Sequence, residues 1–217
     1  MKKTLLLILA FSSSLCAFGQ FPVLSKPYTF GIKAGVNVHR YIFVQKRSYN
    51  VDSRSAIGYQ ISGFFDTPVA PLISFQPGFA LVQKGGDYTG NNDIPVQHRF
   101  VWFQIPVHLV GKIPVRRGNY FIGAGTYGGF ALTGRKTVNL PDQHTRNPIS
   151  FGYNPTDDSE YDDFGVSFTG GFRTARGITL QLGYEQGLTD LRPDGFGIDG
   201  KRTNRVYSFS VGYSFFR

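Results

Sequence analysis

The stretch that decides the fold is Tyr207-Ser208-Phe209-Ser210-Val211-Gly212-Tyr213-Ser214-Phe215. Successive side chains of a strand point to opposite faces, so one face carries aromatic residues and valine while the other carries only serine and glycine. A soluble barrel has an apolar interior and a charged, solvated exterior. The second face here is small and uncharged. It therefore suits a narrow barrel interior, and the aromatic face suits contact with lipid.

The same alternation recurs along the chain. Ile, Leu, Leu and Tyr alternate with Thr, Gln, Gly and Glu over residues 178–185, and Phe and Val alternate with Gly, Ser and Thr over residues 164–169. Residues 101–109 set Val, Phe, Ile, Val and Leu against Trp, Gln, Pro and His. No window of about 11 residues or more carries a helical stripe. The whole chain is therefore predicted to be strand and loop.

Eight such runs predict an all-β fold, an eight-stranded antiparallel up-and-down transmembrane β-barrel. An interior of this size is just wide enough to be filled by side chains, so open-pore transport is not expected. The runs are Tyr28 to Val44, Ser55 to Asp66, Leu72 to Gly85, Val96 to Ile113, Asn119 to Thr133, Asp162 to Thr174, Ile178 to Thr189, and Asn204 to Phe216.

The connections between these runs alternate in length. Residues 67–71, 114–118 and 175–177 are short links, whereas 45–54, 86–95, 134–161 and 190–203 are longer and rich in Gly, Asn, Asp, Pro and Arg. Outer-membrane barrels have short periplasmic turns and longer outer loops. The long links are therefore predicted to face outward from the cell.

The N-terminus is predicted to be a cleaved signal peptide, residues 1–19, followed by one barrel domain, residues 20–217. Lys2 and Lys3 precede an apolar core, residues 5–11, and a small-residue cleavage site, residues 17–19. The core is shorter than the roughly 20 residues that a spanning helix needs. Export to the outer membrane is the expectation.

Cleavage would remove Cys16, the only cysteine, and leave no thiolate for a disulfide, a metal or catalysis. No cofactor is expected. The formal charge of +9 falls by two when the signal leaves, and a basic exported protein suits anionic lipid better than nucleic acid.

Short fragments through nearly the whole mature chain resemble the PorT-like outer-membrane β-barrel family of the Bacteroidota. They are residues 31–37 (GIKAGVN), 76–79 (QPGF), 83–85 (QKG), 105–106 (IP), 120–125 (YFIGAG), 184–190 (YEQGLTD) and 204–205 (NR). The resemblance implies the barrel and no activity. The namesake of the family is similar to an accessory component of a protein secretion and gliding system, so an accessory role in secretion is one expectation.

Polar side chains on the inward face are predicted to form a structural network, because an unpaired charge in a low-dielectric interior is costly. A small-ligand or proton path is the alternative reading. The predicted set is Lys33, Gln60, Gln76, Gln104, Arg173, Gln181 and Glu185. Within it, Glu185 is predicted to accept from Lys33 or Arg173.

Two kinds of chemistry have weaker signals. Some small outer-membrane barrels are lipid hydrolases, but His39, His98 and His144 fall in or near predicted loops, and His108 is predicted to face inward. No serine lies two residues from any of them on the same face. Carboxylates at residues 157–163 could suit calcium but lack the spacing of a calcium loop, so no metal site is predicted.

Basic residues gather at the predicted outer rim, where they suit lipopolysaccharide phosphates or a partner. They are Arg47, Arg54, Lys84, Arg135, Lys136, Arg146, Arg192, Lys201 and Arg202. The leading functional hypothesis is a non-enzymatic, monomeric envelope scaffold that contacts outer-membrane lipid, lipopolysaccharide and another envelope protein. A ligand binder or narrow conduit through the polar interior is the alternative, and a lipid hydrolase is third.

Overall fold

The computed structural model describes residues 28–45, 53–89, 95–139, 144–154, 156–192 and 200–216. The predicted signal peptide and Arg47 lie outside these residues. Within the described part of the chain, no helix is long and apolar enough to cross a membrane.

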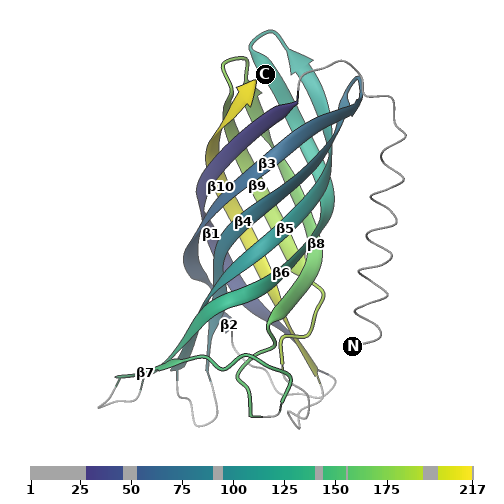
Figure 1. Ribbon diagram of the computed structural model, residues 1–217. Coiled ribbons are helices and arrows are strands. Elements are labelled where there is room, and N and C mark those ends of the chain that lie inside the picture. The colour runs from purple at the N-terminus through teal and green to yellow at the C-terminus, as the bar shows by residue number, and fades with distance from the viewer. Residues whose placement is uncertain are drawn as a thin grey trace, which may run out of the picture.

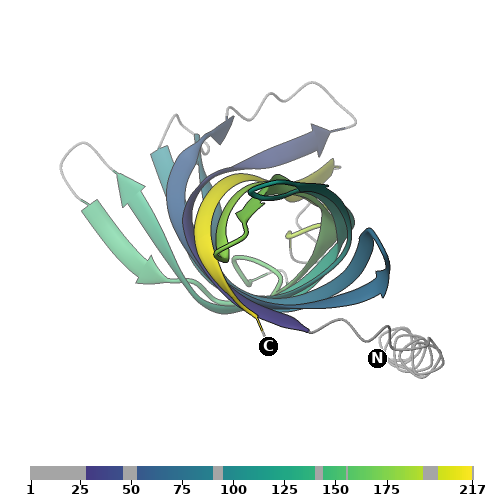
Figure 2. The same cartoon turned by 90° about the horizontal axis from the view of Figure 1, so that it is seen from above.

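The strands form a closed antiparallel ring (Figures 1 and 2). Going around it, the order is β1-β3-β4-β5-β6-β8-β9-β10, and β10 pairs with β1 to close the ring. The bounds are β1 (Thr29–Gln45), β2 (Ser53–Arg54), β3 (Ala56–Ala70), β4 (Ile73–Thr89), β5 (Pro95–Val115), β6 (Gly118–Asn139), β7 (His144–Pro148), β8 (Asp162–Thr174), β9 (Ile178–Gly187) and β10 (Gly200–Phe216). The predicted eight-stranded barrel is confirmed.

Two short strands lie outside the predicted eight. β2 extends the edge next to β4, and β7 pairs only with β6. Figure 2 shows the β6–β7 hairpin outside the ring, so this side of the sheet continues beyond the barrel wall. The hairpin occupies part of the sequence predicted to be one long loop, residues 134–161.

Several ring strands are longer than predicted because pairing continues through residues that resemble turns. β3 runs to Ala70 and pairs across Pro68 with a register irregularity, so the turn before β4 is confined to Pro71 and Leu72. β4 and β6 continue to Thr89 and Asn139 at the opposite end. These extensions carry the sheet past the span that lipid covers.

The outer surface of the barrel wall is apolar, as the alternation predicts. Ile57, Ile122 and Leu182 are each exposed over more than 60% of their surface. Phe209, Val211 and other apolar residues of β10 also point outward. Exposed apolar patches of this extent mark a surface that contacts something other than water. On the outside of a closed outer-membrane barrel, that contact is with lipid.

The two ends of the barrel differ. The turns at Pro71–Leu72, Arg116–Arg117 and Ala175–Gly177 are short and lie at the end where β10 finishes, at the top of Figure 1. The longer connections lie at the other end. By the loop-length rule, the short-turn end is periplasmic and the long-loop end faces outward.

Candidate functional site

All seven residues of the predicted interior set lie on the inward face: Lys33, Gln60, Gln76, Gln104, Arg173, Gln181 and Glu185. Two hydrogen bonds of 2.8 Å each join strands that flank one intervening strand. Lys33 Nζ donates to Gln181 Oε1, and Gln60 Nε2 donates to Ser210 Oγ. These contacts fix the relative positions of strands that are far apart in sequence.

The outer half of the interior is organised around a buried lysine. Lys84 has no exposed surface, and its Nζ lies 2.9 Å from Asp163 Oδ2 and 3.5 Å from Glu185 Oε2. Asp163 also accepts from Tyr127 Oη and Asn204 Nδ2, at 3.3 and 3.1 Å. Three donors therefore converge on a carboxylate that water does not reach.

Two predictions about this cluster were wrong. Lys84 was predicted at the outer rim, but β4 continues past it to Thr89, and the parity that turns Gln76 inward also turns Lys84 inward. Glu185 was predicted to pair with Lys33 or Arg173, but it contacts Lys84 and accepts from Gln104 Nε2 at 3.3 Å. Glu185 pairs with Lys84 because both side chains lie on the inward face of the barrel wall.

A second ionic cluster closes the periplasmic half. Asp66, 1% exposed, accepts from Lys112 Nζ at 2.8 Å and from Arg173 Nη1 at 2.6 Å. The Arg173 guanidinium and the Lys33 ammonium both lie over the ring of Phe64, at 5.4 and 4.4 Å. Asp66 and Lys112 fell outside the predicted set. Asp66 was the last residue of its predicted run and so resembled a turn residue.

The outward mouth is filled by aromatic and aliphatic side chains. Tyr41, Phe100 and Trp102 pack inside the wall against Ile149 and Leu191, which come from the long connections. Each of these five residues is buried. The segment after β7 therefore folds over the barrel opening.

Arg202, also predicted at the outer rim, lies inside the mouth and donates hydrogen bonds to the long connections. It is 6% exposed, and its Nη2 donates to the carbonyl of Leu191 at 2.6 Å and to that of Asp158 at 3.2 Å. Its guanidinium lies 5.1 Å from the ring centre of Tyr41. The prediction of a lipid contact at Arg202 was wrong because its position on β10 shares inward parity with Asn204.

The histidines differ from their predicted setting. His39 and His98 are each 1% exposed and lie inside strands β1 and β5, whereas they were predicted in or near loops. His108 faces inward, and its Nε2 lies 2.8 Å from Ser167 Oγ on β8. The two residues lie on different strands, each opposite Gly125 of β6, so a pattern confined to one strand does not reveal the pair.

The acidic residues of the long connection point in different directions. Asp157 accepts from Ser150 Oγ at 2.8 Å, and this hydrogen bond holds the pKa of its carboxyl below the usual range. Asp158 pairs with Lys136 at 3.0 Å, and Asp163 lies inside the barrel. Over the described ranges of the chain, no three histidine, cysteine or acidic side chains are grouped to hold a metal ion.

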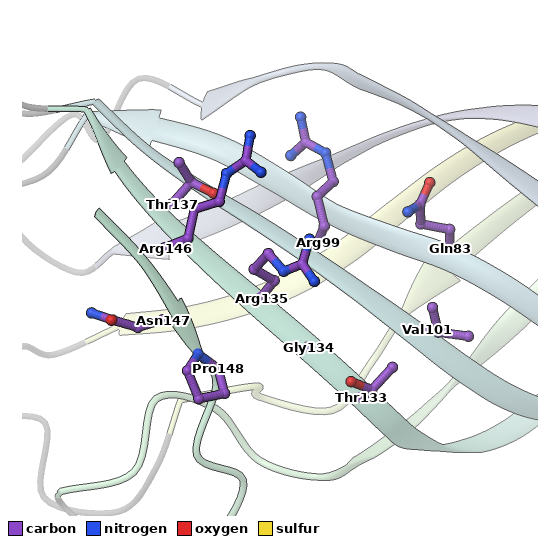
Figure 3. Close-up of a pocket in the computed structure, with 10 residues that line it drawn as sticks. All are labelled: Gln83, Arg99, Val101, Thr133, Gly134, Arg135, Thr137, Arg146, Asn147 and Pro148. Carbon is purple, nitrogen blue, oxygen red and sulfur yellow. The ribbon is translucent and has the colours of Figure 1, made fainter. Parts of the chain in front are cut away.

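Three arginines meet on the outward face of β5, β6 and β7, above the apolar band. Arg99 lies directly across from Arg135 in the β5–β6 register, and Arg146 pairs with Thr137 in the β6–β7 register. They line a groove of about 800 Å³ (Figure 3). The arginine groove is defined here by its polar lining: Gln83, Arg99, Thr133, Arg135, Thr137, Arg146 and Asn147.

A β-bulge creates this arrangement. Val101 pairs with Thr133 and Trp102 pairs with Ala131, so Leu132 is an extra residue on β6. Even-numbered side chains of β6, such as Ile122 and Phe130, point outward before the bulge, and odd-numbered ones do so after it. Bulges re-aim side chains in this way. Without Leu132, Arg135 would be on the inward face.

The other rim residues are spread apart. Arg192 pairs with Asp190 at 2.9 Å, Lys201 donates to the Leu188 carbonyl, and Arg54 is exposed opposite Asp87 in the β2–β4 register. Of the predicted rim residues that the structure describes, Arg135 and Arg146 line the groove. Arg99 was missed, although the outward parity of Val101 and Phe103 extends to it two residues earlier.

Comparison with known proteins gives a family match and several similar solved structures. Residues 18–192 match the family described as "Outer membrane protein beta-barrel domain". No relative was found among curated proteins. Among solved structures, the chain is similar to Ail, the attachment invasion locus protein of Yersinia pestis, with 12% identity and a TM-score of 0.44, covering 88% of this chain and 99% of that one.

Two further solved structures are similar to it over comparable lengths. Neisserial surface protein A has 13% identity and a TM-score of 0.43, covering 86% of this chain and 97% of that one. OprG from Pseudomonas aeruginosa has 13% identity and a TM-score of 0.43, covering 88% and 97%.

Proposed function

Because the chain belongs to the outer membrane protein beta-barrel domain family, we propose that it is a closed, non-conducting outer-membrane barrel with a structural role in the cell envelope. Its interior holds the strands in place, and its exterior surfaces make the contacts that matter to the cell. The observation that carries the proposal is a seal at each end. Asp66 with Lys112 and Arg173 fills the periplasmic half, and the mouth is packed by the cluster around Trp102.

The burial of these groups argues against a water-filled path. Lys84, Trp102 and Gln104 are each at most 1% exposed, and Asp66 is 1% exposed, so water does not touch the side chains that a conduit would need as its lining. The alternative, a narrow conduit or ligand site, would require the buried ion pairs of Lys84 and of Asp66 to separate. Breaking a buried pair costs several kcal/mol, which makes spontaneous opening rare.

A lipid hydrolase is supported less well. Ser167 and His108 are within hydrogen-bonding distance, but Ser167 is 3% exposed and faces the interior. A hydrolase of membrane lipid needs its nucleophile where an acyl ester can reach it. The pair is better explained as a structural hydrogen bond between β5 and β8, which flank β6.

We expect the refolded protein to give no steady conductance in planar lipid bilayers. Because both ends are sealed by buried side chains, current steps should be no more frequent than in protein-free bilayers across ±100 mV of applied potential, roughly the physiological scale. Folding of the same preparation is checked by heat-modifiable migration on gels. Reproducible unitary steps that scale with the amount of folded protein would favour the conduit instead.

The scaffold role includes a contact with another envelope protein, and the resemblance to the PorT-like family of the Bacteroidota adds an accessory role in secretion to it. Site-specific crosslinking in intact cells tests this role. The described residues contain no cysteine, so Arg117→Cys in the exposed periplasmic turn and Asn147→Cys on exposed β7 each introduce one defined attachment point.

We expect one of these two variants to form a discrete adduct with an envelope protein, and the other to form none, because a specific partner contacts one end. The readout is the mass of the adduct and the identity of the attached chain. If neither variant gives an adduct above the cysteine-free background, the scaffold role is wrong for both ends of the barrel.

A further inference from the structure

We propose that the arginine groove binds a phosphate group of an outer-leaflet lipid, the phosphorylated glucosamine headgroup of lipopolysaccharide. Arg99, Arg135 and Arg146 supply the positive charge, and Gln83, Thr133 and Thr137 supply neutral hydrogen-bonding groups around it. The site lies on the outside of the barrel wall and does not depend on whether the barrel conducts.

Without an anion, the arrangement of positive charges in the groove is unfavourable. Arg99 and Arg135 are direct cross-strand neighbours, and like charges directly opposite each other destabilise a sheet. Asp87 pairs with Arg99. Throughout the described part of the chain, Arg135 and Arg146 have no hydrogen-bond or ion-pair partner, and both are exposed. Two positive charges therefore remain unbalanced in one groove.

The groove depends on the extra residue that the β-bulge inserts into β6. The bulge at Leu132 turns Thr133 and Arg135 to the lipid-facing side of β6, and β7 adds Arg146 beside them outside the ring. Figure 3 shows the three arginines reaching from neighbouring strands on the same side of the sheet. Three guanidinium groups from three strands can surround a tetrahedral anion, which a single strand cannot do.

The groove lies just beyond the apolar band of the barrel wall. Ile113, Leu109 and Ile105 of β5 are exposed on the outward face, and Ile113 to Val101 exceeds the roughly 9 to 11 residues that a tilted strand needs to cross the bilayer. Phe103 and Phe130 then point outward as a tilted aromatic pair, with ring centres 5.4 Å apart. Aromatic girdles mark the membrane interface, so Arg99 lies at the level of the lipid headgroups.

The chemistry of the groove selects a phosphate. Arginine binds phosphate through paired N–H donors with both charge and direction, and the threonine and glutamine side chains can donate to its remaining oxygens. A groove of about 800 Å³ also accommodates the sugar that carries the phosphate. On the outer face of an outer membrane, a phosphorylated lipid headgroup meets these requirements at a fixed height.

The test is lipid retention by the refolded full chain in detergent micelles, measured by native mass spectrometry. The probes are diphosphoryl lipid A, the same lipid after enzymatic dephosphorylation, and inorganic phosphate. The wild-type protein should retain diphosphoryl lipid A with at least about 10-fold preference over the dephosphorylated form. Arg135→Gln with Arg146→Gln should abolish most of that preference, because each arginine contributes charge-assisted hydrogen bonds.

The matched control is Arg116→Gln with Arg117→Gln, which removes the same charge from the exposed turn at the opposite end. It should leave retention unchanged. If the double groove variant does not fold, Arg146→Gln alone tests the site, because β7 pairs only with β6 outside the ring. Equal retention of both lipids, equal loss in the control, or equal stabilisation of all variants by inorganic phosphate without lipid preference would each overturn the proposal.

Discussion

Replacing Lys84 with methionine will lower the free energy of unfolding of the barrel by about 3–5 kcal/mol. The substitution keeps much of the side-chain volume but removes the cation that lies 2.9 Å from Asp163 and 3.5 Å from Glu185. Asp163 has no exposed side-chain surface, so its charge would remain without a counterion in a medium that solvates it poorly. The ammonium also lies 4.4 Å from the ring centre of Tyr127, and this cation–π contact is lost with it.

Urea unfolding of the refolded protein in lipid vesicles, followed by circular dichroism, measures the effect. Trp102 is the only tryptophan, but its ring centre is 5.6 Å from Lys84 Nζ, so its fluorescence would change for local reasons. The surface control is Lys136→Met, whose partner Asp158 is partly exposed; it should cost no more than about 1 kcal/mol. Adding Asp163→Asn to Lys84→Met should recover part of the loss. Similar costs for the two lysines would contradict a buried ionic core.

The alternation of side chains predicts the barrel because it repeats on every strand and is enforced by the lipid on one side. A charge turned outward into the lipid would be penalised on each strand separately, and a slip of one residue would turn the whole apolar set away from the lipid. The serine and glycine face of residues 208–214 lies inside as expected, where Ser210 and Ser214 are at most 1% exposed. The strand ends were less accurate because proline and glycine resemble turns even where pairing continues, as at Pro68.

The candidate sites were harder to predict because they depend on facts that local patterns do not carry. The partner of Lys84 comes from β8, and ring closure alone determines that Asp163 is opposite it. The groove depends on the bulge at Leu132, which changes the parity of Arg135 without any mark in the sequence. Lys84 and Arg99 both lie within predicted runs, so the parity of Gln76 already places Lys84 inside and the parity of Val101 already places Arg99 outside.

The second large effect is expected at the periplasmic end, where Asp66→Asn should destabilise the barrel by about 3–5 kcal/mol. Asparagine has nearly the same shape but no charge, and it would leave Lys112 and Arg173 without the carboxylate that lies 2.8 and 2.6 Å from them. Arg173 is 4% exposed, so water cannot compensate its charge. Without the carboxylate, the positive charges of Lys112 and Arg173 repel each other. Lys33 increases this repulsion because its ammonium lies over Phe64, the ring that the Arg173 guanidinium also contacts.

The matched control for this variant is Asp87→Asn, which removes a carboxylate from an ion pair with Arg99 whose two side chains are 24% and 30% exposed. Surface pairs of this kind contribute about 0–1 kcal/mol, so the two identical chemical changes should differ several-fold in cost. Circular dichroism is a suitable probe for both, because Tyr88, next to Asp87, packs against the mouth cluster that contains Trp102. If Asp66→Asn unfolds at the same urea concentration as Asp87→Asn, water or an ion must already reach the periplasmic cluster. The barrel would then be open at that end, and a conduit would become the better account of its function.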